Sequence, residues 1–170
     1  MIILGVDPAL SITGYGAIVL NKHTPALLEA GIISTSAKDK LPQRLDRIYR
    51  AVIKLISDLR PDCLVLEKLY AHYRHPVTAH LLGQARGVIC LACETKAIPL
   101  VEYAATRVKK AVVGRGQASK QQVQRMVAGA LGITKIPKYT DVTDALALAI
   151  AHGNIARLQR IQGRAFLGEK

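Results

Sequence analysis

Acidic residues are scarce in this sequence of 170 residues, which holds 12 Asp and Glu against 24 Lys and Arg and has a formal net charge of +12. Hydrophobic residues make up 50% of the chain, which excludes a disordered basic tail because a chain this apolar can bury a sizeable core. We therefore expect one compact domain with a strongly positive surface. Such a surface favours a polyanionic partner, either nucleic acid or an acidic membrane.

Long apolar runs, a basic leader and an even set of cysteines are also absent. No apolar run reaches the roughly 18 residues that suggest a membrane span, and the chain begins Met1-Ile2-Ile3-Leu4, so we expect neither insertion nor export. Three cysteines, an odd count, indicate a reduced, cytoplasmic protein. Cys90 and Cys93 have the spacing of a redox motif, but they lie in an apolar helical stretch and we interpret them as packing residues.

The pattern of apolar residues predicts an α/β order of elements. Alternation predicts strands over 2–7, 14–21 and 27–35, and the turn signal at 21–25 favours an antiparallel meander. A helix over 41–59, a buried strand over 63–66, a helix over 77–96 and a short strand over 98–102 follow. Pro99 indicates that this last strand lies at a sheet edge or starts late.

Three further helices are predicted over 105–112, 119–131 and 140–159. The elements together give a five-stranded mixed sheet, its first three strands antiparallel, flanked by helices. We expect the domain to span residues 1–155 and residues 156–170 to form a C-terminal tail.

One segment concentrates basic charge and holds no acid. Between Glu102 and Asp141 eight basic residues occur, a third of the total. A solvated helical face usually interleaves acids with its bases, so phosphate binding is the better interpretation of this segment. The eight are Arg107, Lys109, Lys110, Arg115, Lys120, Arg125, Lys135 and Lys138.

Four of the few acids stand where structure alone does not favour them. Asp7 ends the first apolar strand and Glu67 ends the strand over 63–66, so both carboxylates are expected at one edge of the sheet. Asp141 and Asp144 share one face at the start of the last helix. Singly, the aspartates also fit a strand-end turn or helix N-terminal caps. As a set, the four suggest a carboxylate cluster.

A carboxylate cluster in a basic protein has a chemical use. Neighbouring carboxylates raise one another's pKa, and divalent cations relieve the repulsion. Oxygen ligands without a His and Cys set select Mg²⁺ or Mn²⁺ over zinc. Two such ions about 3.5–4 Å apart can activate a water and stabilise the leaving oxygen at a phosphodiester. The residues therefore predict hydrolysis of a nucleic-acid backbone.

At these positions the sequence resembles the RuvC family of crossover junction endodeoxyribonucleases, homodimeric Holliday junction resolvases with an RNase H-like fold. The resemblance runs from residue 1 to about His152. The shared motifs are Gly-Val-Asp-Pro at 5–8, Thr-Gly-Tyr-Gly at 13–16, a strand ending in Glu67, Leu-Gly-Gln-Ala-Arg-Gly at 82–87, the glycine-containing basic segment 108–116 and Asp-x-x-Asp-Ala-Leu-Ala at 141–147.

The resemblance also implies roles for single residues. It implies four catalytic carboxylates that bind two Mg²⁺ per subunit, with Mn²⁺ as a substitute: Asp7, Glu67, Asp141 and Asp144. It implies that Lys109 and Lys120 contact DNA near the scissile phosphate. Ala9 stands where the family usually has Gly, and an added methyl there can shift the turn beside the first metal ligand.

The segment after Glu67 combines aromatic and basic side chains. Tyr70 matches a family position that is usually aromatic, and such a loop can follow a phosphate backbone and stack on unpaired bases, each stack contributing on the order of 1–3 kcal/mol. For Tyr73 an ordinary half-buried tyrosine is an equal alternative. The histidines at 72, 75 and 80 fit no standard metal-ligand spacing. The expected DNA-binding residues are Tyr70, Arg74, Lys109, Lys110, Arg115 and Lys120.

The expected activity is therefore paired, symmetric nicking of four-way junction DNA by a homodimer in recombination and repair, leaving 5′-phosphates. Gly83 and Gly87, four apart on one helix face, are a candidate dimer contact. The resemblance also implies a branch-migration helicase complex as partner. Three alternatives stay open: an RNase H-like ribonuclease in RNA processing with the same carboxylates, a non-catalytic DNA-binding module, and a sugar-kinase-like or actin-like ATPase, which needs two such domains.

Overall fold

The computed structural model describes residues 1–21, 24–69, 76–134 and 137–167. The strands are β1 (Ile2–Asp7), β2 (Ile12–Asn21), β3 (Thr24–Ser34), β4 (Cys63–Glu67) and β5 (Leu100–Tyr103). The helices are α1 (Leu41–Leu59), α2 (Pro76–Thr95), α3 (Ala105–Val113), α4 (Lys120–Leu131) and α5 (Thr140–Leu167). None of these helices combines the length with the hydropathy that crossing a bilayer requires.

The strands form one mixed sheet in the order β3-β2-β1-β4-β5. The β1–β2 and β2–β3 pairs are antiparallel, and the β1–β4 and β4–β5 pairs are parallel. Strands β1 and β4 are interior strands of the sheet and are apolar along nearly their whole length. This is expected, because a strand that is covered on both faces needs apolar side chains on both faces. The predicted five-stranded mixed sheet is confirmed.

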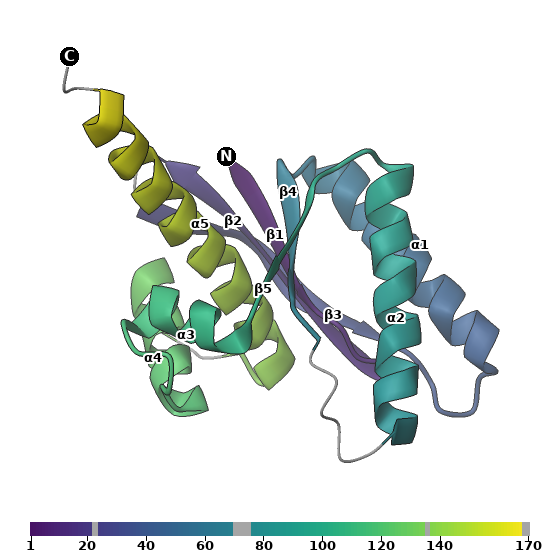
Figure 1. Cartoon of the computed structure of the whole chain (residues 1–170). Coiled ribbons are helices and arrows are strands. Elements are labelled where there is room, and N and C mark those ends of the chain that lie inside the picture. Colours follow the sequence, from purple (N-terminus) through teal and green to yellow (C-terminus); the bar gives the residue numbers. More distant parts are fainter. Residues whose placement is uncertain (22–23, 70–75, 135–136, 168–170) are drawn as a thin grey trace.

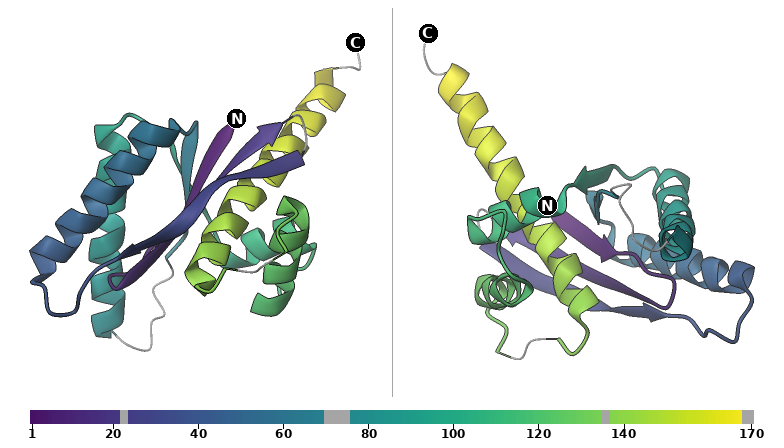
Figure 2. Two further views of the ribbon diagram at one scale, coloured as in Figure 1. Left: turned by 180° about the vertical axis from the view of Figure 1, so that it is seen from behind. Right: turned by 60° about the horizontal axis from the view of Figure 1, so that its bottom comes forward.

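Helices cover both faces of the sheet (Figure 1). Ile3 and Val65 pack with residues of α3, α4 and α5 on one face. Leu4 and Leu64 pack with residues of α1 and α2 on the other. Viewed from behind, the same two layers lie on either side of the strands (Figure 2). The alternation along each central strand thus supplies two cores.

Glycines in the antiparallel strands let α5 lie unusually close to the sheet. A Cβ added at Gly5 would overlap the backbone carbonyl of Ala145, and one at Gly14 would overlap the backbone of Asp141. Only residues without a side chain permit this approach. The first turns of α5 are thereby held beside the end of β1, where Asp7 lies.

Several boundaries differ from the sequence prediction. Strand β3 begins at Thr24, so Thr24 and Pro25 belong to an edge strand, where a missing N–H is tolerated, and residues 22–23 of the predicted turn lie outside the described residues. Strand β5 begins at Leu100, just after Pro99, and lies at the other edge.

The last helix is longer than predicted. Helix α5 continues to Leu167 instead of ending near residue 159, and its C-terminal end extends beyond the sheet in Figure 1. The backbone of residues 156–167 is therefore helical. The division of the chain at residue 155 stays a prediction.

Candidate active site

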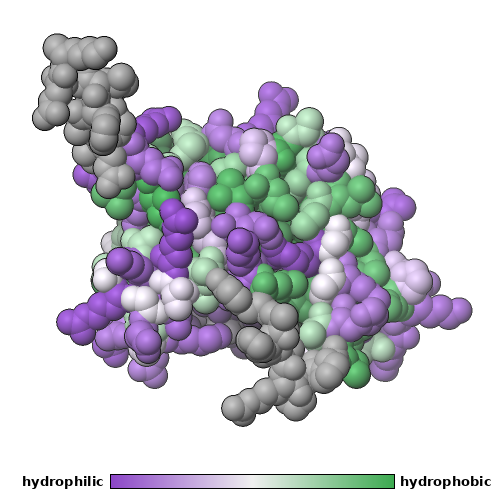
Figure 3. All heavy atoms as spheres, viewed as in Figure 1, coloured by the Kyte–Doolittle hydropathy of each residue, from purple (hydrophilic) through white to green (hydrophobic). Residues whose placement is uncertain are grey.

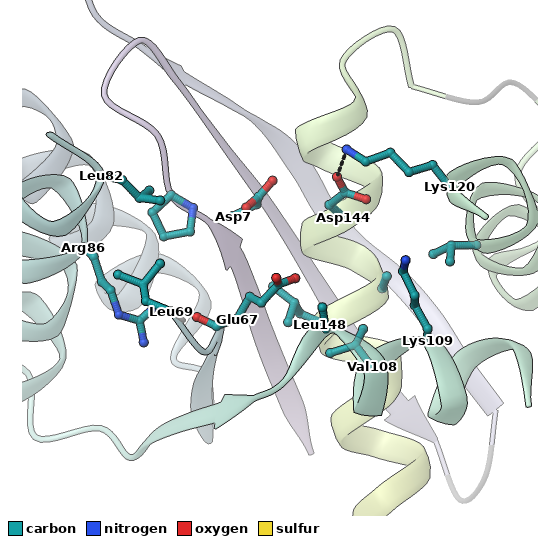
Figure 4. Close-up of a pocket in the computed structure, with 14 residues that line it drawn as sticks. Asp7, Glu67, Leu69, Leu82, Arg86, Val108, Lys109, Lys120, Asp144 and Leu148 are labelled. Atoms are coloured by element: carbon teal, nitrogen blue, oxygen red, sulfur yellow. Dashed lines mark hydrogen bonds and ion pairs between the residues drawn. The ribbon is translucent and has the colours of Figure 1, made fainter. Parts of the chain in front are cut away.

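A cleft of about 300 Å³ opens where the ends of β1 and β4 meet the first turns of α5. Asp7 and Glu67 reach it because each is the last residue of its strand, and parallel β1 and β4 end at the same edge of the sheet. Asp144 comes from α5. Figure 4 shows these three carboxylates around the cleft, with lysines reaching it from α3 and α4. The charged lining residues are Asp7, Glu67, Asp144, Arg86, Lys109 and Lys120.

The fourth predicted carboxylate lies at the margin of this group. Asp141 is half-buried, one turn before Asp144 on α5, and it is not among the residues that line the cleft. Its charge nevertheless acts on Asp7, whose pKa it helps to raise. The structure thus brings three of the four carboxylates into one cleft and leaves the fourth within electrostatic reach.

Burial and the charges of neighbouring acids raise the pKa of two of these carboxylates, Asp7 and Glu67. Burial, followed by the charges of Asp144, Asp141 and Glu67, raises the pKa of Asp7 from 3.8 to about 7, and Lys120 opposes this. Burial and the charge of Asp144 likewise raise the pKa of Glu67, which nearby basic groups lower. The cleft therefore holds negative charge that the chain itself does not fully compensate.

Two lysines supply positive charge on the α3–α4 side of the cleft. Lys120 Nζ lies 3.4 Å from Asp144 Oδ2, the contact drawn as a dashed line in Figure 4. Lys120 is the first residue of α4, whose start is fixed by the N-cap Ser119 and its reciprocal bonds with Gln122. Lys109 lines the cleft from α3. A phosphate entering the cleft would meet both ammonium groups.

The other predicted DNA contacts are less close to the carboxylates. Lys110 and Arg115 are exposed and do not line the cleft. Tyr70 and Arg74 lie outside the described residues. The roles predicted for all of these residues stay predictions.

The donor set of the cleft fits a divalent cation that prefers oxygen ligands. Across the described ranges, no three His, Cys, Asp or Glu side chains are gathered tightly enough to hold a metal ion. The chemistry still matches, because burial and the charges of three neighbouring carboxylates raise the pKa of Asp7, and a bound cation would relieve the repulsion among these carboxylates. The only described histidine of the 72–80 segment, His80, contacts Gln84 instead.

The turn after Asp7 accommodates the alanine at position 9. The Thr13 hydroxyl donates to the Ala9 carbonyl at 2.7 Å and accepts from the Ala9 N–H at 3.3 Å. Arg60 and Ala97 are the non-glycine residues with positive φ in the described part of the chain, so Ala9 adopts a backbone open to any residue. The methyl group therefore imposes no backbone strain beside the first carboxylate.

Comparison with known proteins places these features in a family. A family model described as Crossover junction endodeoxyribonuclease RuvC matches residues 3–152. The chain belongs to this family. A relative of that name from Halothermothrix orenii is 43% identical over 163 residues, which cover 96% of this chain and 98% of the relative. Another, from Ruminiclostridium cellulolyticum, is 42% identical with the same coverage of both chains.

Solved structures agree with the RuvC assignment. RuvC of Thermus thermophilus in complex with Holliday junction substrate has a TM-score of 0.89 and 30% identity, covering 94% of this chain and 96% of that chain. The yeast mitochondrial Holliday junction resolvase Ydc2, with a TM-score of 0.65, 13% identity and coverage of 89% and 77%, shows the same fold. The predicted fold class, family and enzyme class are confirmed. Nucleases of the RuvC family depend on divalent metal ions.

Sequence reasoning missed Arg86 as a residue of this RuvC cleft. Arg86 lines the cleft from α2, on the side opposite the two lysines (Figure 4). A signal was present, because Arg86 is the only Lys or Arg from Pro76 to Thr95 and lies within the shared motif at 82–87. A lone arginine in an apolar helix needs a partner, and the sequence does not name that partner.

Proposed function

We propose that this chain resolves four-way DNA junctions by hydrolysing one phosphodiester in each of two strands of like polarity. The observation that carries the proposal is the cleft in which Asp7, Glu67 and Asp144 face Lys109 and Lys120. Carboxylates alone would repel a DNA backbone, and lysines alone would bind it without cutting. The two together match phosphodiester hydrolysis on a polyanion.

The carboxylates would hold two Mg²⁺, with Mn²⁺ as a substitute. Asp7, Glu67 and Asp144 line the cleft, and Asp141 is the fourth ligand that the RuvC motif implies. When bound, the cations supply the positive charge that favours deprotonation of water and stabilises the leaving 3′ oxygen. Their charge would also favour the ionised form of Asp7, whose pKa is otherwise raised to about 7.

The lysines would bind and orient the phosphate. Lys120 already contacts Asp144, so an arriving phosphate oxygen and this carboxylate compete for one ammonium group. Lys109, whose charge acts on Glu67 to lower its pKa, adds a second positive charge to the cleft. Exposed Lys110 and Arg115 extend the positive surface beyond the cleft, where further phosphates of a junction arm would lie. Tyr70 and Arg74, which follow Glu67 in sequence, are proposed to contact DNA at the junction centre.

A homodimer would supply one cleft to each of two strands. The outer face of α2 is suited to a second copy: a Cβ at Gly83 or Gly87 would meet no atom within 4 Å, and Val77 and Leu91 are 73% and 56% exposed. In Figure 3, hydrophobic patches on this side of the molecule are interspersed with hydrophilic residues. Apolar and small residues along one helix face permit close, self-complementary packing about a two-fold axis.

Replacement of Glu67 by Gln tests the proposed chemistry. The variant keeps the shape of the side chain and loses the charge that a cation requires. We expect Glu67→Gln to bind a four-way junction in chelator with unchanged affinity and to leave it uncut after Mg²⁺ is added. Glu29→Gln, which removes a carboxylate on β3 that contacts Tyr15, is the matched control and should cut at the wild-type rate. Cleavage by Glu67→Gln at the wild-type rate would refute the proposal.

A further inference from the structure

Arg86 is a basic side chain held almost entirely away from water. It is 8% exposed, although it lies in the cleft-facing part of α2. Removing a guanidinium from water is costly unless ionic and hydrogen-bonding partners replace the lost hydration. The partners of Arg86 therefore indicate what the residue does.

The guanidinium joins two neighbouring strands at the cleft. Its Nη1 donates to the backbone carbonyl of Glu67 at 2.7 Å. Its Nη2 forms an ion pair with the carboxylate of Glu102 on β5. Nη1 is thus hydrogen-bonded, whereas Nη2 is buried and is held by the ion pair without a hydrogen bond of its own among the described residues. The planar fork therefore ties the Glu67 carbonyl to the Glu102 carboxylate of β5.

Glu67 lies where the sheet itself gives less support. The β1–β4 register ends at Val6 and Leu66, so Glu67 is one residue beyond it. On the other side the ladder ends at the pair Glu67 and Tyr103, followed by the bond from the Lys68 N–H to the Tyr103 carbonyl at 2.8 Å. The Arg86 bond therefore acts at the point where β4 leaves the sheet.

We propose that Arg86 is a positioning residue for the carboxylate of Glu67. By holding the Glu67 carbonyl and Glu102 with one rigid fork, it fixes the backbone from which the Glu67 side chain enters the cleft. Arg86 acts through Glu67 and does not itself bind the phosphate, since Nη1 donates to the Glu67 carbonyl and Nη2 is buried beside the Glu102 carboxylate. The inference rests on the proposed role of Glu67 in binding a divalent cation.

Lysine is a poor replacement for this function. Its single ammonium group is a compact point charge and does not reproduce a hydrogen bond to a carbonyl together with an ion pair to a carboxylate on the next strand. Residues that orient metal ligands typically change metal affinity or activity by about 10–100-fold when replaced. Arg86→Lys should keep the buried positive charge, and therefore the fold, while losing part of the positioning.

The test compares five variants: Arg86→Met, Arg86→Lys, Glu102→Gln, Lys120→Ala and Arg50→Met. Mn²⁺ binding is measured by titration of the protein alone, junction affinity is measured in chelator at several salt concentrations, and nicking is measured in single turnovers. For Arg86→Met we expect Mn²⁺ affinity and nicking to fall about 10–100-fold, with junction affinity and its salt dependence unchanged. Arg86→Lys should recover only part of the loss.

Two controls separate positioning from DNA contact and from charge. Lys120→Ala should flatten the slope of log affinity against log salt by roughly 0.9 per lost phosphate contact. Arg50→Met removes an exposed arginine that pairs with Asp46 on α1 and should match wild type in every assay. If Arg86→Met instead flattens the salt slope as Lys120→Ala does, Arg86 is a phosphate contact and the positioning role is wrong.

Failure to fold and failure of the proposed function give distinct results. Glu102→Gln removes the negative charge of residue 102 but keeps an oxygen that can accept from Arg86. This variant should lower Mn²⁺ affinity less than Arg86→Met does, and a cooperative melting transition should show that it is folded. Wild-type Mn²⁺ affinity in folded Arg86→Lys and Glu102→Gln would overturn the inference. A wild-type protein that leaves junctions uncut would refute the proposed function whatever these variants do.

Discussion

At the scale of single residues, the position of Asp7 explains the chemistry of the cleft best. The residue ends a central strand, so its carboxylate is half-buried and meets the charges of three other acids. Together these raise the pKa of Asp7 to about 7. Without a cation the carboxylate is then partly protonated at neutral pH. A bound divalent ion would favour the ionised form and stabilise the folded protein.

Replacement of Asp7 by Asn should stabilise the metal-free protein only at higher pH. The folded pKa of about 7 exceeds the ordinary value of 3.8, so the stability that Asp7 contributes is present at low pH and is lost as pH rises through 7. In chelator, Asp7→Asn should raise the free energy of unfolding by about 1–3 kcal/mol at pH 8.5 and change it little at pH 4. Urea unfolding at both pH values measures the difference.

Asp39→Asn is the matched control for this experiment, because Asp39 is exposed and distant in sequence from the cleft carboxylates. Its effect should be small and alike at the two pH values. An equal effect of Asp7→Asn at pH 4 and pH 8.5 would show that Asp7 ionises normally in the folded protein.

The local sequence pattern predicts the carboxylates of the cleft but not the role of Arg86. Asp7 and Glu67 were predictable because each carboxylate directly ends an apolar strand, where a charge is unexpected. Asp144 was predictable as a member of a set. The role of Arg86 was not, because its bond to the Glu67 carbonyl joins residues 19 apart through the packing of α2 against the sheet.

At the scale of elements, the close approach of α5 to β1 and β2 assembles the site. The helix carries Asp144 and Asp141, and it reaches the end of β1 only because Gly5 and Gly14 have no side chain to obstruct it. The two glycines therefore determine where Asp144 lies relative to Asp7, although neither glycine takes part in the proposed chemistry.

Replacement of Gly14 by Ala should displace α5 from the sheet. The new Cβ would overlap the backbone of Asp141. Because this backbone is part of α5, the overlap is relieved only if the helix moves as a whole. We expect a loss of about 1–3 kcal/mol in the free energy of unfolding and a larger loss of nicking. Gly129→Ala, whose Cβ would meet no atom within 4 Å, should instead stabilise α4 by about 0.5–1 kcal/mol. Wild-type stability of Gly14→Ala would contradict the proposed packing.

Element types were predictable more fully than element ends. The helical spacing of apolar residues located α1 within its observed bounds, Leu41–Leu59. The start of β3 was missed because Thr24 and Pro25 have turn propensity, whereas pairing with β2 includes both in the strand. The end of α5 was missed because residues 157–160, where the predicted helix ends, are exposed and no longer follow the buried apolar pattern of the preceding turns.

At the scale of the whole molecule, the described residues form one cleft lined by Asp7, Glu67 and Asp144, so the two coordinated nicks that we propose need two chains. The outer face of α2 is the surface on which we expect the second copy to bind. Leu91→Glu places a charge on this face and should shift the sedimentation of the protein from dimer to monomer at micromolar concentration, without lowering the melting temperature of the monomer. Arg60→Glu, on the loop after α1, is the charge-changing control and should leave the dimer intact. An unchanged dimer in Leu91→Glu would locate the interface elsewhere.

The balance of charge also has its meaning at this scale. The net charge of +12 indicated a polyanionic partner but not a reaction on that partner. Only the fold shows that acidic residues from β1, β4 and α5 meet at one cleft. Neither the orientation of the two subunits in the proposed homodimer nor the contacts of Tyr70 follows from the sequence pattern of a single chain.

The central claim is that two such clefts cut two strands of one junction. The most direct test incubates the wild-type protein and Mg²⁺ with a mobile four-way junction, each strand labelled in turn, and maps the nicks. We predict nicks at symmetric positions in two opposite strands of like polarity, with 5′-phosphates that DNA ligase can seal. Nicks that fall on one strand alone, or at unrelated positions on all four strands, would contradict the account.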